Sequence, residues 1–253
     1  MDREQILNRL QAVPGKVGFY YKDLVTGERF GLNENELFES ASVIKLPMYA
    51  VIMKLCHEGK LKLTDKLTCH DWEKKPSCGA LQFFSGNFEV EIGTLCALMI
   101  TLSDNTATNM FIRHFGIDFL NEQFKEIGLE QSHIERFLFD PAASAQGKEN
   151  RVTPYEMGTL LERIWRHEYM SEEISRQMET ILQKQQIKHK IRGYLPKSIP
   201  CMNKTGEDEG ITNDVGLVYA PEHPFVVCYT FNQADVPEAE RAIREITLEL
   251  LNL

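Results

Sequence analysis

The sequence predicts an α/β protein of two lobes, in which an antiparallel sheet is flanked by N- and C-terminal helices and an all-helical lobe is inserted. Helical periodicity dominates residues 40–183, whereas short β-like runs stand before this block and after residue 198. Because both ends of the chain then belong to the sheet, we expect one domain over residues 1–253. Its sheet lobe comprises 1–38 and 185–253, and its helical lobe comprises 39–184.

The elements of the sheet lobe follow from local patterns. "REQILNRLQAV", residues 3–13, has apolar positions at helical spacing and ends before Pro14-Gly15, which indicates an N-terminal helix. Residues 16–33 contain two β-rich runs around Asp23 to Gly27, which is typical of a hairpin. "IPCMNKTGED", "ITNDVGLVYAP" and "PFVVCYTFNQ" predict three strands, and "VPEAERAIREITLELLNL" predicts a closing amphipathic helix.

The helical lobe is predicted from four stretches that combine an apolar face with a polar one. They are "SVIKLPMYAVIMKLCHEGKL", "VEIGTLCALMITLSDNTATNMFIRHFG", "GIDFLNEQFKEIGL" and "TPYEMGTLLERIWRHEYM". In the last of these, Thr153 before Pro154 predicts a helix N-cap followed by proline at the first helical position. We expect a functional site in the cleft between the two lobes.

Composition restricts the class of partner. The 253 residues are 43% hydrophobic and carry a formal net charge of −9, so the chain buries a core but lacks the basic surface needed for nucleic acid or an anionic membrane. No run approaches the ~18 apolar residues of a membrane helix. We expect a small-molecule or peptide substrate, no nucleic-acid or membrane partner, and a monomer by default.

The N-terminus and the cysteines carry no targeting or metal signal. "MDREQILNRLQAVPG" is too polar for a signal peptide, so the chain as it stands predicts a cytoplasmic protein, or an exported one if a leader was removed. The six cysteines form no CxxC pair, and four lie in or near apolar segments, which favours buried thiols. The seven histidines show no ligand spacing such as H-E-x-x-H, so we predict no metal.

The stretch "FESASVIKLPMY", residues 38–49, places Ser42 three residues before Lys45. In a helix these positions share a face, so the lysine amine can reach the serine hydroxyl. Burial and a nearby cation would lower the pKa of Lys45 from its usual value of about 10.4 and expose its basic form. About one S-x-x-K is nevertheless expected by chance in a chain of this length, so the pair alone does not establish a nucleophile.

Two further tripeptides strengthen the case. "SDN", Ser103 to Asn105, places three turn-forming polar residues inside an apolar helical run, and "KTG", Lys204 to Gly206, lies in the first β-like segment after the helical block. Each is expected only about 0.05 times by chance in such a chain. Taken singly, SDN is also a plausible helix break and KTG a plausible strand end, but finding both after S-x-x-K and in this order is difficult to assign to chance.

The ordered S-x-x-K, SDN and KTG motifs are those of class A β-lactamases and penicillin-binding proteins, and the chain resembles that serine hydrolase superfamily over nearly its whole length. The resemblance implies that Ser42 is acylated, with Lys45 as its proton partner and Ser103 as a relay to the leaving nitrogen. The substrate-binding residues that it implies are Asn105 for the substrate amide, Lys204 and Thr205 for the carboxylate, and Gly206 for close approach of the substrate backbone. The backbone N–H groups of Ser42 and Glu207 would form the oxyanion hole, Asp104 would be structural, and no cofactor is implied.

One family feature is missing. Class A enzymes carry a deacylating glutamate in an E-x-x-L-N setting, and residues 135–154, "ERFLFDPAASAQGKENRVTP", contain none. If Arg136 and Asn150 brace this loop, the place of the glutamate falls near Leu138. Asp140, Glu135 and Glu149 are then the remaining candidates for the deacylation base.

A second departure concerns charge. The acidic run from Glu207 to Glu209 faces the expected carboxylate site, and the "ITNDVGLVYAP" strand has no arginine to assist Lys204. We also expect no disulfide between Cys96 and the helix after Ser42, because Tyr49 stands at the reciprocal place.

These observations favour a class A-type serine hydrolase that opens a β-lactam amide through an acyl-Ser42 intermediate, a chemistry that underlies antibiotic resistance. Alternatives are a D-Ala peptidase or esterase of the penicillin-binding-protein type, or a covalent β-lactam-binding domain with slow turnover. An inactive member of the fold is the weakest alternative, because all three motifs are intact.

Overall fold

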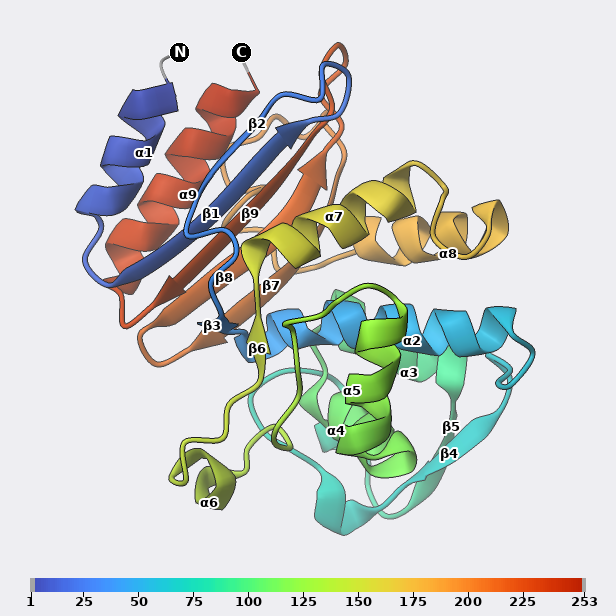
Figure 1. The fold of residues 1–253 in the computed structure, drawn as a ribbon. Coiled ribbons are helices and arrows are strands. Elements are labelled where there is room, and N and C mark those ends of the chain that lie inside the picture. Colours follow the sequence, from blue (N-terminus) through green and yellow to red (C-terminus); the bar gives the residue numbers. More distant parts are fainter. Residues whose placement is uncertain (1–2, 252–253) are drawn as a thin grey trace.

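Five antiparallel strands form the main sheet in a computed structural model that describes residues 3–251 (Figure 1). Their order across the sheet is β2-β1-β9-β8-β7, so β7 lies at one edge. The first two strands form the predicted hairpin, in which Tyr20 pairs with Gly31. The bounds are β1 (Lys16–Asp23), β2 (Arg29–Leu32), β7 (Cys201–Asp208), β8 (Ile211–Val218) and β9 (Phe225–Asn232).

Both faces of the sheet are covered. The helices α1 (Arg3–Ala12) and α9 (Val236–Leu250) lie side by side on one face, so the two ends of the chain meet there (Figure 1). Successive side chains of β1 point to opposite faces of the sheet. Phe19 and Tyr21 therefore pack with these helices, whereas Tyr20 packs with the helical lobe. The residues of β8 and β9 are all buried, as expected of strands covered on both sides.

The inserted lobe is dominated by helices. A 3-10 helix, η1 (Ala41–Ile44), leads directly into α2 (Lys45–His57), which runs through the centre of the lobe (Figure 1). The other helices are α3 (Ile92–Thr101), α4 (Asn105–Phe115), α5 (Ile117–Glu126), α6 (Pro141–Ser144), α7 (Pro154–Trp165) and α8 (Glu172–Gln183), with two single 3-10 turns, η2 (Asp71–Glu73) and η3 (Leu81–Phe83). The Thr153 side chain accepts a hydrogen bond from the Glu156 N–H, so the predicted N-cap and following proline open α7.

The lobe also contains short strands, so it is mainly rather than entirely helical. Two small antiparallel pairs occur, β4 (Lys66–Cys69) with β5 (Phe88–Glu91), and β3 (Phe38–Glu39) with β6 (Arg151–Val152). Segments of two to four residues are too short to show an alternating pattern. α3 follows β5 directly, and the stretch predicted to be helical begins at Val90, inside this strand.

One hydrophobic core joins the two lobes. Buried residues of α2, α4 and α7 cluster with the inward side chains of the sheet, among them Tyr20 and Val226. Gly158 on α7 permits this packing, because a Cβ there would lie 2.4 Å from the Tyr20 ring. The motifs at the start of α2, between α3 and α4, and on β7 are thereby held at the junction of the lobes.

The cysteine prediction agrees with the structure. All six thiols are free, and four are buried: Cys69, Cys96, Cys201 and Cys228. Tyr49 on α2 and Cys96 on α3 are both buried in the core, and Cys96 is a free thiol. Among residues 3–251 there is no helix of sufficient length and hydropathy to cross a membrane.

Candidate active site

Ser42 and Lys45 stand where the 3-10 helix η1 passes into α2. Three residues make one turn of a 3-10 helix, so the two side chains lie on the same side of the segment. The Lys45 Nζ donates a hydrogen bond of 2.9 Å to the Ser42 Oγ, and Ser42 remains partly exposed. Ala41 has a left-handed φ of 42°, a conformation that is unusual for alanine and often marks a functional site.

Lys45 is fully buried among oxygen atoms. Besides Ser42, its Nζ donates to the Ser103 carbonyl at 2.7 Å, the Ser103 Oγ at 3.1 Å and the Asn105 Oδ1 at 2.7 Å. Burial holds the pKa of Lys45 well below its usual value, and the nearby charge of Lys204 lowers it further. The lysine next to the nucleophile is thus biased towards its neutral, basic form.

The SDN motif forms the predicted break between α3 and α4. Ser103 has a φ of 55°, and Asp104 caps α4 by accepting a hydrogen bond from the Ala107 N–H. The other Asp104 carboxylate oxygen accepts from the N–H groups of Ala80 and Leu81, at 2.7 and 2.9 Å. The prediction that Asp104 is structural is therefore consistent with its contacts.

Lys204 on β7 reaches the same centre from the sheet lobe. Its Nζ donates to the Ser103 Oγ at 3.0 Å and to the Thr205 carbonyl at 2.7 Å, and the side chain is fully buried. Burial lowers the pKa of Lys204 to about 7, although the charge of Asp214 opposes this shift. Burial also raises the pKa of Asp214 to about 6, while Asn203 donates to its carboxylate at 3.0 Å.

Gly206 allows the edge strand β7 to lie directly against η1. A Cβ at this position would come within 2.6 Å of the Ser40 carbonyl and 3.1 Å of the Ser42 amide nitrogen. The family resemblance implied that this glycine makes room for the substrate backbone. In the structure it also allows β7 and η1 to approach each other closely. The backbone of Ser42 and the β7 residue after Gly206, Glu207, are brought to one place as a result.

A residue that the sequence did not indicate, Lys190, lies behind β7. Its Nζ donates to the carbonyls of Gly206 and Asn213, at 3.1 and 3.2 Å, and lies 3.1 Å from a Glu207 carboxylate oxygen. The acidic strand end is therefore partly neutralised by a buried lysine that comes from the irregular segment before β7. No motif marks this residue, because its role depends on the fold of residues 184–200 against the sheet.

The loop at residues 135–150 engages all three candidate bases in other contacts. Glu149 forms an ion pair with Arg136 at 2.6 Å and accepts from the Ser144 hydroxyl. Asp140 caps α6 by accepting from the Ala143 N–H, and Glu135 accepts from the Glu149 N–H. Arg136 and Asn150 both brace the loop: the Arg136 guanidinium pairs with Glu149, and the Asn150 side chain bonds to the Arg136 backbone.

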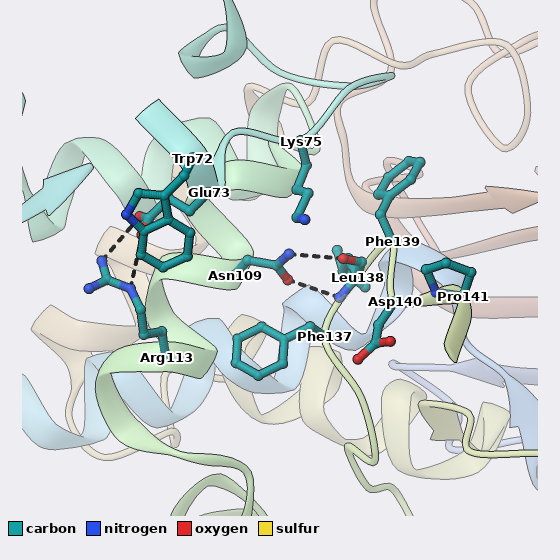
Figure 2. A pocket seen from close by; sticks show the side chains of 10 residues that line it. All are labelled: Trp72, Glu73, Lys75, Asn109, Arg113, Phe137, Leu138, Phe139, Asp140 and Pro141. Atoms are coloured by element: carbon teal, nitrogen blue, oxygen red, sulfur yellow. Dashed lines mark hydrogen bonds and ion pairs between the residues drawn. The ribbon is translucent and has the colours of Figure 1, made fainter. Parts of the chain in front are cut away.

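Leu138 is held by its backbone rather than by its side chain. Asn109 on α4 donates to the Leu138 carbonyl and accepts from its N–H, both at 2.9 Å (Figure 2). The Leu138 side chain lines the cavity that also contains Ser42. An apolar residue thus lines the same cavity as the nucleophile, at the position where the sequence comparison locates the missing glutamate.

The predicted site residues lie together, three of them on the wall of one cavity and the others behind it. The hydrogen bonds above link Ser42, Lys45, Ser103, Asn105 and Lys204, and Gly206 with Glu207 lies beside them on β7. A cavity of about 850 Å³ opens over Ser42, Asn105 and Glu207. Thr205, between Lys204 and Gly206 on β7, is nearly fully buried. Ser42 lines this cavity, whereas the amines of Lys45 and Lys204 are fully buried behind it. A hydroxyl with a buried basic amine beside it suits nucleophilic acyl transfer.

Comparisons with known proteins agree with this architecture. The model of the Beta-lactamase enzyme family matches residues 3–253. A beta-lactamase of Streptomyces lavendulae is 26% identical, over 92% of this chain and 80% of that protein. The crystal structure of a beta-lactamase from Sphaerobacter thermophilus is 29% identical with a TM-score of 0.89, and covers 100% of this chain and 97% of that one.

A second kind of relative has the same fold. The structure of PBP-A is 28% identical with a TM-score of 0.89, over 98% of this chain and 94% of that chain, and a mutant of PBP-A was solved as an acyl-enzyme complex with penicillin G. The fold and the motif set define an acyl-transferring serine hydrolase of the class A type. The chain belongs to the Beta-lactamase enzyme family.

Proposed function

We propose that the protein opens the amide of a β-lactam ring through an acyl-Ser42 intermediate. The observation that carries this proposal is the contact of a fully buried Lys45 with the Ser42 hydroxyl, at 2.9 Å. Family membership across the chain supports the same substrate class.

Acylation begins with attack by the serine hydroxyl. The Ser42 Oγ forms a bond to the lactam carbonyl carbon while its proton passes to the neutral amine of Lys45. The carbon–nitrogen bond of the ring then breaks, and the nitrogen takes up a proton through the Ser103 hydroxyl, which accepts hydrogen bonds from Lys45 and Lys204. The N–H groups of Ser42 and Glu207 would stabilise the oxyanion.

Substrate binding would use both lobes. Lys204 and Thr205 would bind the substrate carboxylate, and Lys190 would offset the charge of Glu207 beside it. Asn105 would bind the acyl amide, because its Nδ2 donates at 3.2 Å to the Pro76 carbonyl and so keeps a second N–H for a ligand.

We further infer that the acyl-enzyme is long-lived. Release requires a base that activates a water molecule, and Leu138 cannot act as one. Glu149, Asp140 and Glu135 are engaged elsewhere in the loop. A second function is favoured by the same observation, namely transfer or slow hydrolysis of an acyl-D-Ala-D-Ala peptide, in which an amine or water at the cleft releases the acyl group.

Intact-mass spectrometry after a short penicillin pulse tests the proposal. We expect wild type to gain the mass of one penicillin, to retain it after removal of free compound, and to carry it on Ser42 by peptide mapping. Ser42→Ala should gain none. Absence of an adduct together with absence of hydrolysis would refute the proposal, whereas release of D-alanine from an acyl-D-Ala-D-Ala peptide would favour the second function.

A further inference from the structure

Lys190 bonds to the peptide group that carries one of the two proposed oxyanion donors. Its Nζ donates to the Gly206 carbonyl at 3.1 Å, and this carbonyl belongs to the same peptide unit as the Glu207 N–H. The Lys190 side chain is fully buried, and Ser42 and Glu207 line the cleft without it. The lysine therefore acts on the cleft from behind, through the backbone of β7.

The pairing of β7 with β8 fixes the direction of this peptide. Gly206 lies opposite Asn213, and the same Lys190 Nζ also donates to the Asn213 carbonyl, at 3.2 Å. Two opposite carbonyls come within reach of one nitrogen when they point towards each other, as in a hydrogen-bonded antiparallel pair. A trans peptide directs its C=O and N–H groups to opposite sides. The Glu207 N–H thus points away from β8, towards the free edge of the sheet, where η1 carries Ser42.

The residues on either side hold Lys190 in place. The Ile191 N–H donates to the Asp214 carboxylate at 3.0 Å, and the Ile191 side chain is fully buried in the core of the sheet lobe. The His189 ring lies 3.2 Å from the Glu240 carboxylate on α9. Because these contacts fix both neighbours, the Lys190 ammonium is held against the two carbonyls before any substrate binds. Such preorganisation is what makes electrostatic stabilisation of a transition state effective.

A cation at the carbonyl end of a peptide strengthens the donor at its other end. A hydrogen bond to the C=O polarises the peptide and makes its N–H more positive. The ammonium itself would lie roughly 8 Å from an oxyanion at the Glu207 N–H, which is the length of one peptide and two hydrogen bonds. At an effective dielectric constant of about 20, a unit charge at this distance changes a rate by about 30-fold. The Glu207 carboxylate, 3.1 Å from the Lys190 Nζ, offsets part of this effect.

We propose that Lys190 is a positioning residue of the oxyanion hole, which orients and polarises the peptide between Gly206 and Glu207 and so speeds acylation of Ser42. As the Ser42 Oγ bonds to the acyl carbon, an electron pair of the carbonyl moves to its oxygen, and it returns when the ring nitrogen leaves. Lys190 stabilises that charge without touching the substrate. This inference rests on the proposed acylation of Ser42.

The first test compares Lys190→Met with Lys188→Met. Methionine is of similar length but has neither charge nor donor, and Lys188 is exposed on the same segment, so its loss changes the net charge equally. Acylation rates are measured by intact mass with a penam and with the methyl ester of that penam, which has no carboxylate. We expect Lys190→Met to lose about 10- to 30-fold with both compounds and Lys188→Met to stay within about twofold of wild type. A loss confined to the free carboxylate would assign Lys190 to carboxylate binding and overturn the proposal.

Glu207→Gln separates the action on the peptide from simple neutralisation of the carboxylate. In this background the carboxylate is gone, whereas the backbone N–H and the Gly206 carbonyl remain. We expect the added Lys190→Met substitution to cost at least about 10-fold there too, because the contact with the peptide is the same. A double variant that reacts as fast as Glu207→Gln alone would mean that Lys190 only neutralises Glu207.

The acyl-enzyme, which we infer to be long-lived, gives a direct signal. The ester carbonyl of acyl-Ser42 would accept hydrogen bonds from the same two N–H groups, and stronger hydrogen bonds lower its stretching frequency. With a penam isotope-labelled at the lactam carbonyl, we expect difference infrared spectra to show this band at higher wavenumber in Lys190→Met than in wild type. Lys190→Arg, which keeps the charge and the donors, should return the band towards its wild-type position. An unchanged band in Lys190→Met would contradict polarisation of the peptide.

These outcomes differ from failure of acylation itself. Absence of any adduct in wild type would refute the proposed function, whereas an adduct that forms equally fast in Lys190→Met would overturn the role of Lys190 alone. A thermal melt of each variant shows whether it is folded. Where Lys190→Met is less stable, the infrared band decides, because it reports on the folded acyl-enzyme.

Discussion

Ser103 accepts hydrogen bonds from Lys45 and Lys204 through one hydroxyl oxygen, at 3.1 and 3.0 Å. Two ammonium groups so close together repel each other, and both side chains are fully buried. Burial lowers the pKa of both lysines, and the charge of Lys204 lowers the pKa of Lys45 further. The proposed base and the proposed carboxylate-binding residue are electrostatically linked as a result.

This linkage predicts the pH dependence of acylation. The second-order rate should rise with pH as Lys45 loses its proton, because the neutral amine is the base. For a substrate with a carboxylate it should fall above pH of about 7, because Lys204, with a pKa of about 7, then loses the charge that binds the carboxylate. The measurement is a pH profile of acylation for a penam and for a neutral ester. An alkaline fall of equal size with the neutral ester would contradict the role of Lys204.

Leu138 offers a second prediction at the level of single residues. Leu138→Glu places a carboxylate beside the cleft while Asn109 keeps its two hydrogen bonds to the backbone at 138. We expect the lifetime of the acyl-enzyme to shorten by about 10²-fold or more, as general base catalysis typically contributes. Leu138→Gln, of similar size without a base, is the matched control. Equal lifetimes for the two variants, measured by the decay of the adduct mass, would show that position 138 does not govern deacylation.

At this scale the sequence predicted the residues that carry a motif and missed those that do not. Ser42, Lys45 and Ser103 were singled out because their motifs occur in a known superfamily, and the structure places them within hydrogen-bonding distance of one another. Lys190 and Asn109 were not, since Lys190 acts through contacts with neighbouring strands and Asn109 through the backbone of a distant loop.

Among the elements, the contact between η1 and the edge strand β7 shapes the cleft most directly. The first carries the nucleophile and the second carries Lys204, and the two lie so close that only glycine fits at position 206. An edge strand also leaves alternate backbone groups free of sheet partners, so β7 can present N–H groups to a ligand.

Gly206→Ala tests this contact. The added Cβ would meet the Ser40 carbonyl at 2.6 Å, so β7 must move away from η1. We expect a loss of about 1–3 kcal/mol in the free energy of unfolding and a large loss of acylation, because both lobes of the cleft shift. Gly93→Ala is the control. Gly93 lies in α3, where alanine is favoured over glycine, and the added Cβ would lie 3.3 Å from the Leu63 carbonyl. Chemical denaturation gives the free energy of unfolding, and the adduct mass followed over time gives the acylation rate. An acylation rate equal to that of wild type would show that the contact between η1 and β7 is not needed for acylation.

Elements were predictable where a pattern ran over enough residues. The long amphipathic helices and the three C-terminal strands follow from the sequence, whereas β4 with β5 and β3 with β6 do not, because each has four residues or fewer. Their existence depends on pairing between segments that lie far apart in the chain, as Lys66 with Glu91 and Phe38 with Val152. No local rule specifies such pairing.

Across the whole molecule, the two lobes share one core instead of meeting at a polar interface. Side chains of α2 and α7 pack in the same cluster as Tyr20, Met202 and Val226 of the sheet. The cleft is therefore lined by segments whose relative position is fixed by packing, as preorganised catalysis requires. The order of the segments in the chain predicted the insertion of one lobe into the other, but the continuity of the core becomes visible only in the folded molecule.

The two hydrogen bonds from Asn109 to the backbone at 138 also bear on how such a protein can change over generations. They hold the peptide in place whatever side chain it carries. If position 138 governs deacylation as we propose, its replacement would change the lifetime of the acyl-enzyme without altering the residues that form it. A protein that keeps its acyl group for a long time and one that hydrolyses it quickly would then differ by a single substitution on the same fold.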